Sequence, residues 1–190
     1  TEPRYRNVNP IAGLQAWGPY DASVPGYLRP NPLRIAVICS ERSFGAVLGF
    51  IRRIAQGANH NSPDEYVIDW PGFRQVFQTN LEYPQDSTNS LVRLVAEKDV
   101  EQARHAVHPE IAFLEILKNH LRSLLPVRHE FDVVIIHIPE RWSAFRECKD
   151  EDYYFDLHDA LKVFGAPNNI CIQLVYRLCL TRHHMTPAHG

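Results

Sequence analysis

Three polar side chains in the last part of the chain have the types and spacing of an anion-binding site. His158 and Lys162 are four residues apart in a segment that predicts a helix, so they lie one above the other on one face. Gln173 is a polar residue within the otherwise apolar run Ile170–Val175. A phosphate binds where charge-assisted donors converge on its oxygens, and these side chains could supply them. The alternative is a surface helix with an Asp159–Lys162 ion pair, in which the other two side chains are structural.

A helix, a tight turn and a strand are predicted to position these side chains. The segment Tyr153–Phe164 predicts a helix, because Leu157, Leu161 and Phe164 recur at helical spacing. The segment Ala166–Asn169 contains a Pro and two Asn, which are typical turn residues. The apolar run that follows has the length and β-branched content of a buried strand.

This order of residues resembles the 5′-phosphate pocket of the MID domain of Argonaute proteins. The segment reads H-D-A-L-K, then a turn that contains Pro, then a hydrophobic strand that carries Gln. The similarity is greater to prokaryotic Argonautes whose pocket begins with His instead of Tyr. The resemblance implies that His158, Lys162 and Gln173 bind the 5′-phosphate of a guide strand. It also implies that Tyr153 or Tyr154 stacks on the first base. The family's fourth pocket residue, a second Lys, has no clear counterpart here.

A second segment, G-L-Q-A-W-G-P-Y-D-A-S at Gly13–Ser23, resembles the G-L-x-x-x-G-P-Y segment that leads into this domain in prokaryotic Argonautes. The resemblance implies a single-stranded guide RNA or DNA and its target as partners, in nucleic-acid-guided defence. Members with His in the pocket include short Argonautes, which work with a partner protein that carries an effector domain. Mg²⁺ would bind with the guide phosphates in the full-length protein. Nuclease activity is not expected from this chain, because the slicer residues of the family lie in a PIWI domain.

The predicted domain organisation has three parts. Residues 1–32 are rich in Pro, Gly, Tyr and Asn without a regular period, which predicts an extended arm or linker. Residues 33–182 are predicted to form the α/β domain. Residues 183–190 are predicted to be a tail that leads toward an absent PIWI domain.

The first half of this domain predicts a βαβ unit. Leu33–Cys39 is a continuous apolar run of strand length, and Ser40 or Ser43 could cap the helix that follows, which ends at Gly57. A second strand is predicted at Tyr66–Ile68. Such a unit implies a parallel sheet with a right-handed crossover.

The second half continues the alternation of helices and strands. Leu91–Val107 and Glu110–Leu125 predict helices, and Pro71–Phe77 predicts either a strand or a short helix. Phe131–Ile138 is the strongest predicted strand. The alternation predicts a Rossmann-like three-layer α/β sandwich with a mainly parallel central sheet, which is also the fold that the Argonaute resemblance implies.

Composition limits the classes of function. The chain has 190 residues, of which 45% are hydrophobic, and a net charge of −2, which argues against a nonspecific nucleic-acid coat protein but not against a pocket for one end. The four cysteines lie far apart without C-x-x-C spacing, which favours a reducing, cytoplasmic setting. No apolar run approaches the length of a membrane span, about 18 residues.

Other chemistry has weaker signals. Dinucleotide, P-loop and G-x-S-x-G motifs are absent. His137, near a strand end, is a candidate catalytic base, but an isolated His at such a place is more often structural. His183, His184 and His189 lack acidic or Cys neighbours, so no metal site is predicted there.

Two rival functions stay open from the sequence. A Rossmann-like small-molecule enzyme would need an activated nucleophile beside a base, and none is visible. A Rossmann-like protein-interaction domain without nucleic-acid binding would use Trp70, Phe73, Trp142 and Phe145 as surface anchors, unless these aromatic side chains are core residues.

Overall fold

The computed structural model describes residue 13 and residues 32–58, 70–150 and 153–176. Four regions of the sequence predictions lie outside these described residues. They are the strand at Tyr66–Ile68, the tail 183–190, Cys179 and the arm apart from Gly13 and Pro32.

The chain forms two compact units, Thr1–Arg34 with Phe50–Glu82 and Ile35–Gly49 with Tyr83–Gly190. In the first unit, the start of β1 pairs with the short parallel strand β2 (Leu81–Glu82). The ambiguous segment Pro71–Phe77 contains a short helix, α3 (Phe73–Phe77).

Aromatic packing holds the first unit together around this helix. The Trp70 indole N–H donates to the Ile54 carbonyl at 2.8 Å, and the rings of Phe73 and Phe77 lie 4.6 Å apart. Trp70 and Phe73 are therefore partly buried packing residues of this unit.

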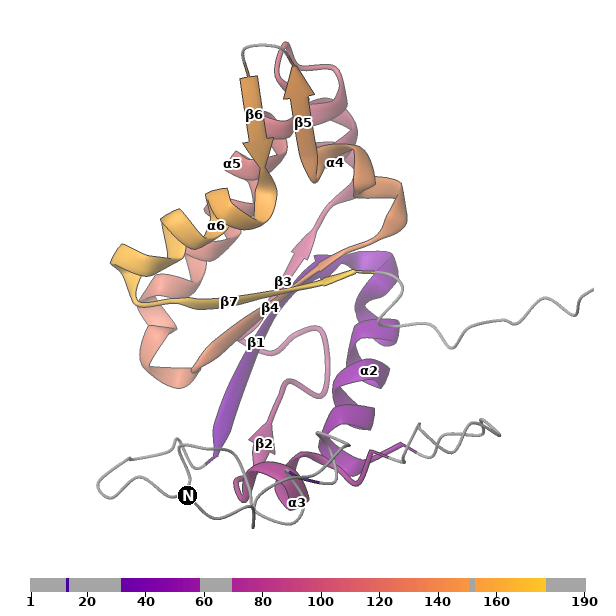
Figure 1. Ribbon diagram of the computed structural model, residues 1–190, viewed down its shortest axis with the longest axis vertical. Coiled ribbons are helices and arrows are strands. Elements are labelled where there is room, and N and C mark those ends of the chain that lie inside the picture. The colour runs from indigo at the N-terminus through magenta and orange to yellow at the C-terminus, as the bar shows by residue number, and fades with distance from the viewer. Residues whose placement is uncertain (1–12, 14–31, 59–69, 151–152, 177–190) are drawn as a thin grey trace, which may run out of the picture. The chain divides into compact units, whose positions relative to one another are not determined.

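A mainly parallel sheet forms the centre of the second unit (Figure 1). The strands β1 (Leu33–Ser40), β4 (Val133–Ile138) and β7 (Cys171–Tyr176) pair in parallel in that order, and β3 (Val92–Val95) also pairs with β1. The end of β1 and nearly all of β4 are buried on both faces, as expected for a parallel sheet that is covered on both sides. The strands predicted at Leu33–Cys39, Phe131–Ile138 and Ile170–Val175 are confirmed.

Helices cover the sheet on both faces. Figure 1 shows α4 (Glu97–Arg104), α5 (Pro109–Leu124) and α6 (Leu157–Gly165) on one side of the sheet. The start of α2 (Phe44–Gln56), which is the part of this helix that belongs to the second unit, lies on the other side. The predicted helices at Glu110–Leu125 and after Ser43 are confirmed. The protein therefore has the predicted Rossmann-like three-layer α/β fold.

The main core lies between the sheet and the layer of α4, α5 and α6. Leu117 and Leu121 of α5 are fully buried there, and burial of each leucine contributes about 1.5 to 3 kcal/mol. The Phe113 ring stacks on Phe145 with centroids 4.5 Å apart and meets the edge of Trp142 at 5.3 Å. Trp142 and Phe145 are thus core residues and not surface anchors.

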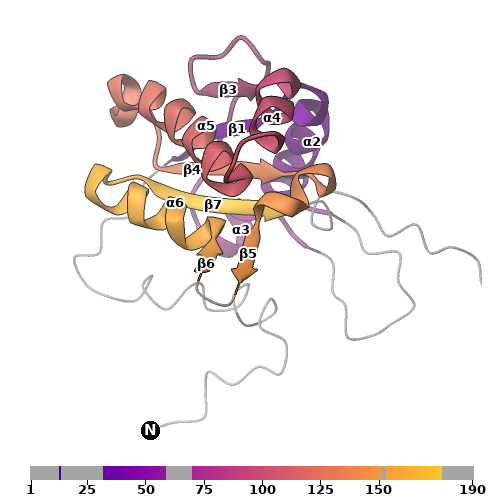
Figure 2. The same cartoon turned by 90° about the horizontal axis from the view of Figure 1, so that it is seen from above.

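Two predicted helix boundaries are wrong. The helix predicted from Tyr153 begins at Leu157, because Tyr153–Asp156 forms β6, which pairs antiparallel with β5 (Glu147–Asp150), as Figure 2 shows. Cross-strand pairing outweighs the helical spacing of the leucines for these first residues.

The helix predicted over Leu91–Val107 is likewise divided. Its first part is β3, which pairs with β1, and only Glu97–Arg104 is helical. Val92 and Val95 are buried in the sheet, where β-branched side chains pack well. No helix in the described part of the chain is long and apolar enough to cross a membrane.

Two glycine substitutions should have opposite effects on stability. A Cβ at Gly165 would lie 2.7 Å from the Ile170 carbonyl oxygen and 2.9 Å from Ile172 Cδ1, so Gly165→Ala should destabilise the protein by about 1 to 3 kcal/mol. Gly45 in α2 has no such neighbour within 4 Å, so Gly45→Ala should stabilise it by up to about 1 kcal/mol. Urea unfolding measures both changes, and an equal effect of the two variants would contradict the close packing of α6 on the start of β7.

Candidate functional site

The helix α6 is fixed at both of its ends. At its end Gly165 packs closely against Ile170 and Ile172, at the start of β7. At its beginning the Asp156 carboxylate accepts a hydrogen bond from the Asp159 backbone N–H at 3.0 Å, which caps the helix. The helix therefore runs back along β7, and its N-terminus lies toward the carboxyl end of that strand.

The apolar side of α6 leaves His158 and Lys162 on its outer side. Leu157 and Leu161 are buried in the main core, whereas Lys162 is exposed and His158 is partly exposed. His158 Nδ1 lies 3.3 Å from a carboxylate oxygen of Asp159. The alternative Asp159–Lys162 ion pair is not formed, and the Lys162 ammonium makes no ion pair with any described residue. Lys162 is thus a cation available to a ligand.

Gln173 lies on the opposite face of the sheet from α6. Leu174 belongs to the same core cluster as Leu157 and Leu161, and successive side chains of a strand point to opposite faces. The exposed Gln173 side chain donates a hydrogen bond to the Leu174 carbonyl at 2.9 Å. The structure brings His158 and Lys162 together on one helix, but no described contact joins either of them to Gln173.

Tyr153 and Tyr154 point to different sides of β6, because they are neighbours in a strand. Tyr153 turns toward the start of α5, where its ring lies 6.2 Å from that of His108 and where burial, followed by the Glu110 carboxylate, raises the pKa of its hydroxyl. Tyr154 is 61% exposed, and its ring lies 5.6 Å from the Lys149 ammonium. One ligand could therefore stack on only one of these rings, and Tyr154 is the more accessible.

Asp156, His158 and Asp159 form the group most like a metal site, since one ligand atom from each lies within 4.8 Å of the others. Carboxylate oxygens are ligands that Mg²⁺ prefers, so Asp156 and Asp159 fit a Mg²⁺ that is also bound to phosphate. The imidazole nitrogen of His158 fits it less well. Exposed acidic groups are common without an ion, and this group alone assigns no metal site.

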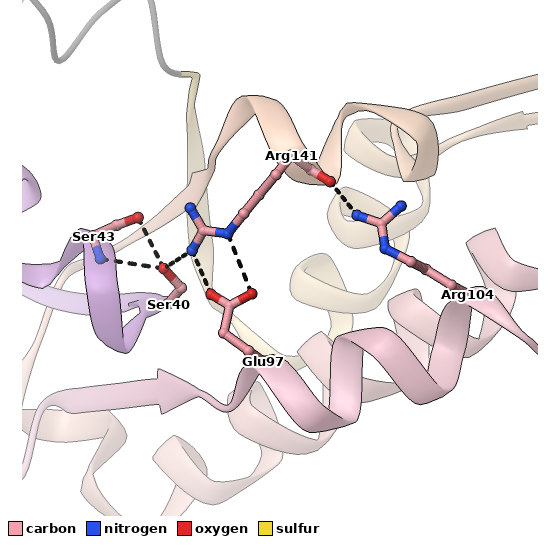
Figure 3. A network of polar contacts seen from close by, with 5 residues as sticks. All are labelled: Ser40, Ser43, Glu97, Arg104 and Arg141. Atoms are coloured by element: carbon pink, nitrogen blue, oxygen red, sulfur yellow. Dashed lines mark hydrogen bonds and ion pairs between the residues drawn. The ribbon is translucent and has the colours of Figure 1, made fainter.

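A polar network that the sequence analysis missed lies where β1 and β4 end (Figure 3). Arg141, just after β4, donates to Ser40 Oγ at 2.6 Å and to both carboxylate oxygens of Glu97, with Nε–Oε2 at 3.2 Å. These bonds lower the pKa of Glu97. Arg104 donates to the Arg141 carbonyl, and Ser43 accepts from Ser40 at 2.8 Å. The one local signal for Arg141 is its position directly after the strongest predicted strand.

His137 is buried beside this network. It is 3% exposed, and neither of its ring nitrogens has a hydrogen-bond partner among the described residues. Burial, and then the charges of Arg141 and Arg146, lower its pKa to about 4. It is therefore neutral at physiological pH and closed off from solvent, which favours the structural role over that of a catalytic base.

A groove with a volume of about 800 Å³ lies between α4 and α5. Ala103, Ala112 and Ile116 form apolar parts of its wall, and Asn119 and His120 form polar parts. None of the predicted site residues lines this groove.

The chain matches no protein-family model, and a search of curated proteins finds no match either. The fold and the geometry of these residues are therefore the grounds for the functional proposal.

The buried His137 should make stability depend on pH. Its folded pKa of about 4 is below the ordinary value of 6.5, so between these values only the unfolded chain takes up the proton. Its contribution to stability is complete above pH 6.5 and is lost as the pH falls toward 4, with a slope of up to about 1.4 kcal/mol per pH unit. His137→Leu should reduce this slope in urea unfolding measured at several pH values.

Val175→Ala is the matched control, because Val175 lies beside His137 in the register but does not titrate. This variant should be less stable at every pH and keep the wild-type slope. A wild-type slope in His137→Leu would show that the imidazole is not held neutral by burial.

Proposed function

We propose that this domain binds the 5′-phosphorylated end of a single-stranded guide nucleic acid at the start of α6, as MID domains of Argonaute proteins do. The observation that carries the proposal is the pair His158 and Lys162 on the outer side of a helix that begins toward the carboxyl end of β7. Ligands of parallel α/β sheets collect at that edge. The ammonium of Lys162, which forms no ion pair within the described part of the chain, supplies the charge that a phosphate requires.

Each side chain has a distinct role in this proposal. Lys162 pairs with the terminal phosphate, and His158 donates a hydrogen bond to it. Tyr154 offers an exposed ring on which the first base stacks. Gln173 would act from the other face of the sheet and contributes less than the two helix residues.

The wider setting belongs to the same proposal. The bound guide directs recognition of a target strand in prokaryotic defence in the cytoplasm, with a partner protein that carries the effector domain. Mg²⁺ would neutralise part of the charge of the guide phosphates, and Asp156 and Asp159 are the carboxylates beside the pocket that could touch it. These residues hold and orient the end of a strand, and cleavage is not assigned to them.

The removal of Lys162 should abolish the preference for a 5′-phosphate. Lys162→Ala deletes a charge-assisted contact worth about 1.5 to 3 kcal/mol, which corresponds to a loss of roughly 10- to 100-fold in affinity. The measurement is fluorescence anisotropy with short RNA and DNA strands, with and without the 5′-phosphate, at fixed salt. Lys118→Ala, which removes a lysine that Glu115 already pairs on α5, is the control and should bind like the wild type. An unchanged preference in Lys162→Ala would refute the proposal.

The position of Gln173 gives a second prediction. Because its side chain lies on the face opposite to α6, Gln173→Ala should lower the affinity for the same 5′-phosphorylated strand by less than Lys162→Ala does. The two variants are compared in the same anisotropy titration. A larger loss in Gln173→Ala would mean that the phosphate lies on the Gln173 side of the sheet.

A further inference from the structure

The ends of β1 and β4 have the topology of a ligand site. These strands are parallel neighbours, and the chain leaves β1 toward α2 on one face and leaves β4 toward α6 on the other. Between two such strands the connections diverge, and open α/β sheets bind their ligands in the crevice that results. Five side chains lie at the ends of β1 and β4 and are called the strand-end cluster: Ser40, Glu97, His137, Arg141 and Arg146.

The guanidinium of Arg146 has hydrogen-bond donors in this cluster that no described residue occupies fully. Its guanidinium lies over the Tyr176 ring, 4.4 Å from the centroid, and its buried Nε has no partner among the described residues. Its other contacts are long, 3.5 Å to the Ile138 carbonyl and 3.7 Å to the Glu140 carboxylate. A buried donor without a partner costs free energy, so a ligand that accepts from it gains affinity.

Arg141, by contrast, is already occupied by an internal anion. The Glu97 carboxylate accepts two hydrogen bonds from its guanidinium, which is the geometry in which arginine binds a carboxylate or a phosphate. Ser40 Oγ lies on the same guanidinium, and this serine is fully buried. Glu97 therefore marks a place where an external oxyanion fits, and competes for it.

The cluster is adjacent to the start of α6. The Leu157 backbone N–H donates to the Arg146 carbonyl at 2.9 Å, so the chain at Arg146 touches the first residue of the helix that carries His158 and Lys162. Arg146 reaches the Ile138 carbonyl at the end of β4, and Arg141 reaches Ser40 Oγ at the end of β1, so the two guanidinium groups lie at the ends of neighbouring strands. The positive groups thus extend from α6 across the ends of β7, β4 and β1.

We propose that Arg146 and Arg141 form a second oxyanion subsite, which binds an internal phosphodiester of the same strand whose 5′ end α6 holds. Glu97 is the internal occupant that this phosphodiester displaces. The inference rests on the proposed function for the identity of the strand. The cations that extend the pocket, Arg141 and Arg146, come from the segment before α6.

The test compares a 5′-phosphorylated mononucleotide with 5′-phosphorylated strands of four to six nucleotides. The longer strands should bind the wild type more tightly than the mononucleotide does, and Arg146→Gln and Arg141→Gln should each reduce this gain in affinity by about 3- to 10-fold. Each substitution should also reduce the slope of log affinity against log salt concentration by about 0.7. Glu97→Gln should increase this gain, because it removes the competing carboxylate without changing its shape. Opposite effects of Glu97→Gln and Arg141→Gln distinguish ligand binding from a structural ion pair, which would weaken with either change.

Strands with one neutral methylphosphonate linkage locate the contact. When the neutral linkage replaces the phosphodiester that Arg146 contacts, the wild type and the Arg146→Gln variant should bind that strand with equal affinity, because the charged contact is already lost. The comparison is a double-mutant cycle. The proposal is overturned if lengthening gives the same gain in all variants, or if the two substitutions of the Arg141–Glu97 pair act in the same direction. Urea unfolding verifies that each variant is folded, and Glu97→Gln and Arg146→Gln still decide the question if Arg141→Gln does not fold.

Inorganic phosphate separates this inference from the function on which it rests. If the 5′-phosphate preference is absent but phosphate binds more tightly to Glu97→Gln and less tightly to Arg141→Gln, the subsite stands and the guide-end proposal fails. If the 5′-phosphate preference depends on Lys162, but longer strands gain the same affinity in Arg141→Gln and Arg146→Gln as in the wild type, the guide-end proposal stands and the subsite is refuted.

Discussion

The parallel pairing of β4 with β7 is the constraint on which the rest of the arrangement depends. The register runs without a break from Val133–Cys171 to Ile138–Tyr176, and it decides which side chains of β7 face the α5 and α6 layer. Because Leu174 faces that layer, Gln173 faces away from it. The same register brings Tyr176 level with the end of β4, where the Arg146 guanidinium covers its ring. A shift of one residue would exchange the two faces and expose the core.

Burial of the sheet on both faces moves its polar chemistry to the strand ends. Polar side chains need hydrogen-bond partners when they are buried, so they are expected at the strand ends, where they can pair with one another. Arg141 and Ser40 follow this rule and pair with each other at the ends of β4 and β1. His137 departs from it, because it is enclosed without a hydrogen-bond partner among the described residues. Such departures are tolerated where a stable core compensates for them, and they concentrate near functional sites.

The net charge of the chain is −2, so the binding of a phosphate would depend on individual cations and on how far their neighbours neutralise them. The cations of the two proposed sites are neutralised to different degrees. Lys162 has no described ion pair, Arg146 has a long one, and Arg141 has a close one. Asp156 and Asp159 lie beside His158 and would repel a phosphate. Recognition of a strand by this edge would therefore depend on the placement of single charges and not on a general positive field.

The sequence alone determined the α/β class, the central strands and α5. Burial of an element on one or two faces gives its apolar residues a characteristic spacing, which is visible in a short stretch of sequence. The spacing of His158 and Lys162 was equally local, since one helical turn separates them. Tertiary structure decided the rest. β3 and β6 were missed because pairing with a neighbouring strand outweighs the propensity of four residues. Glu97 and Arg141 are 44 residues apart, so only the folded sheet brings them together. The face of Gln173 depended on where α6 packs, and packing is a property of the whole core.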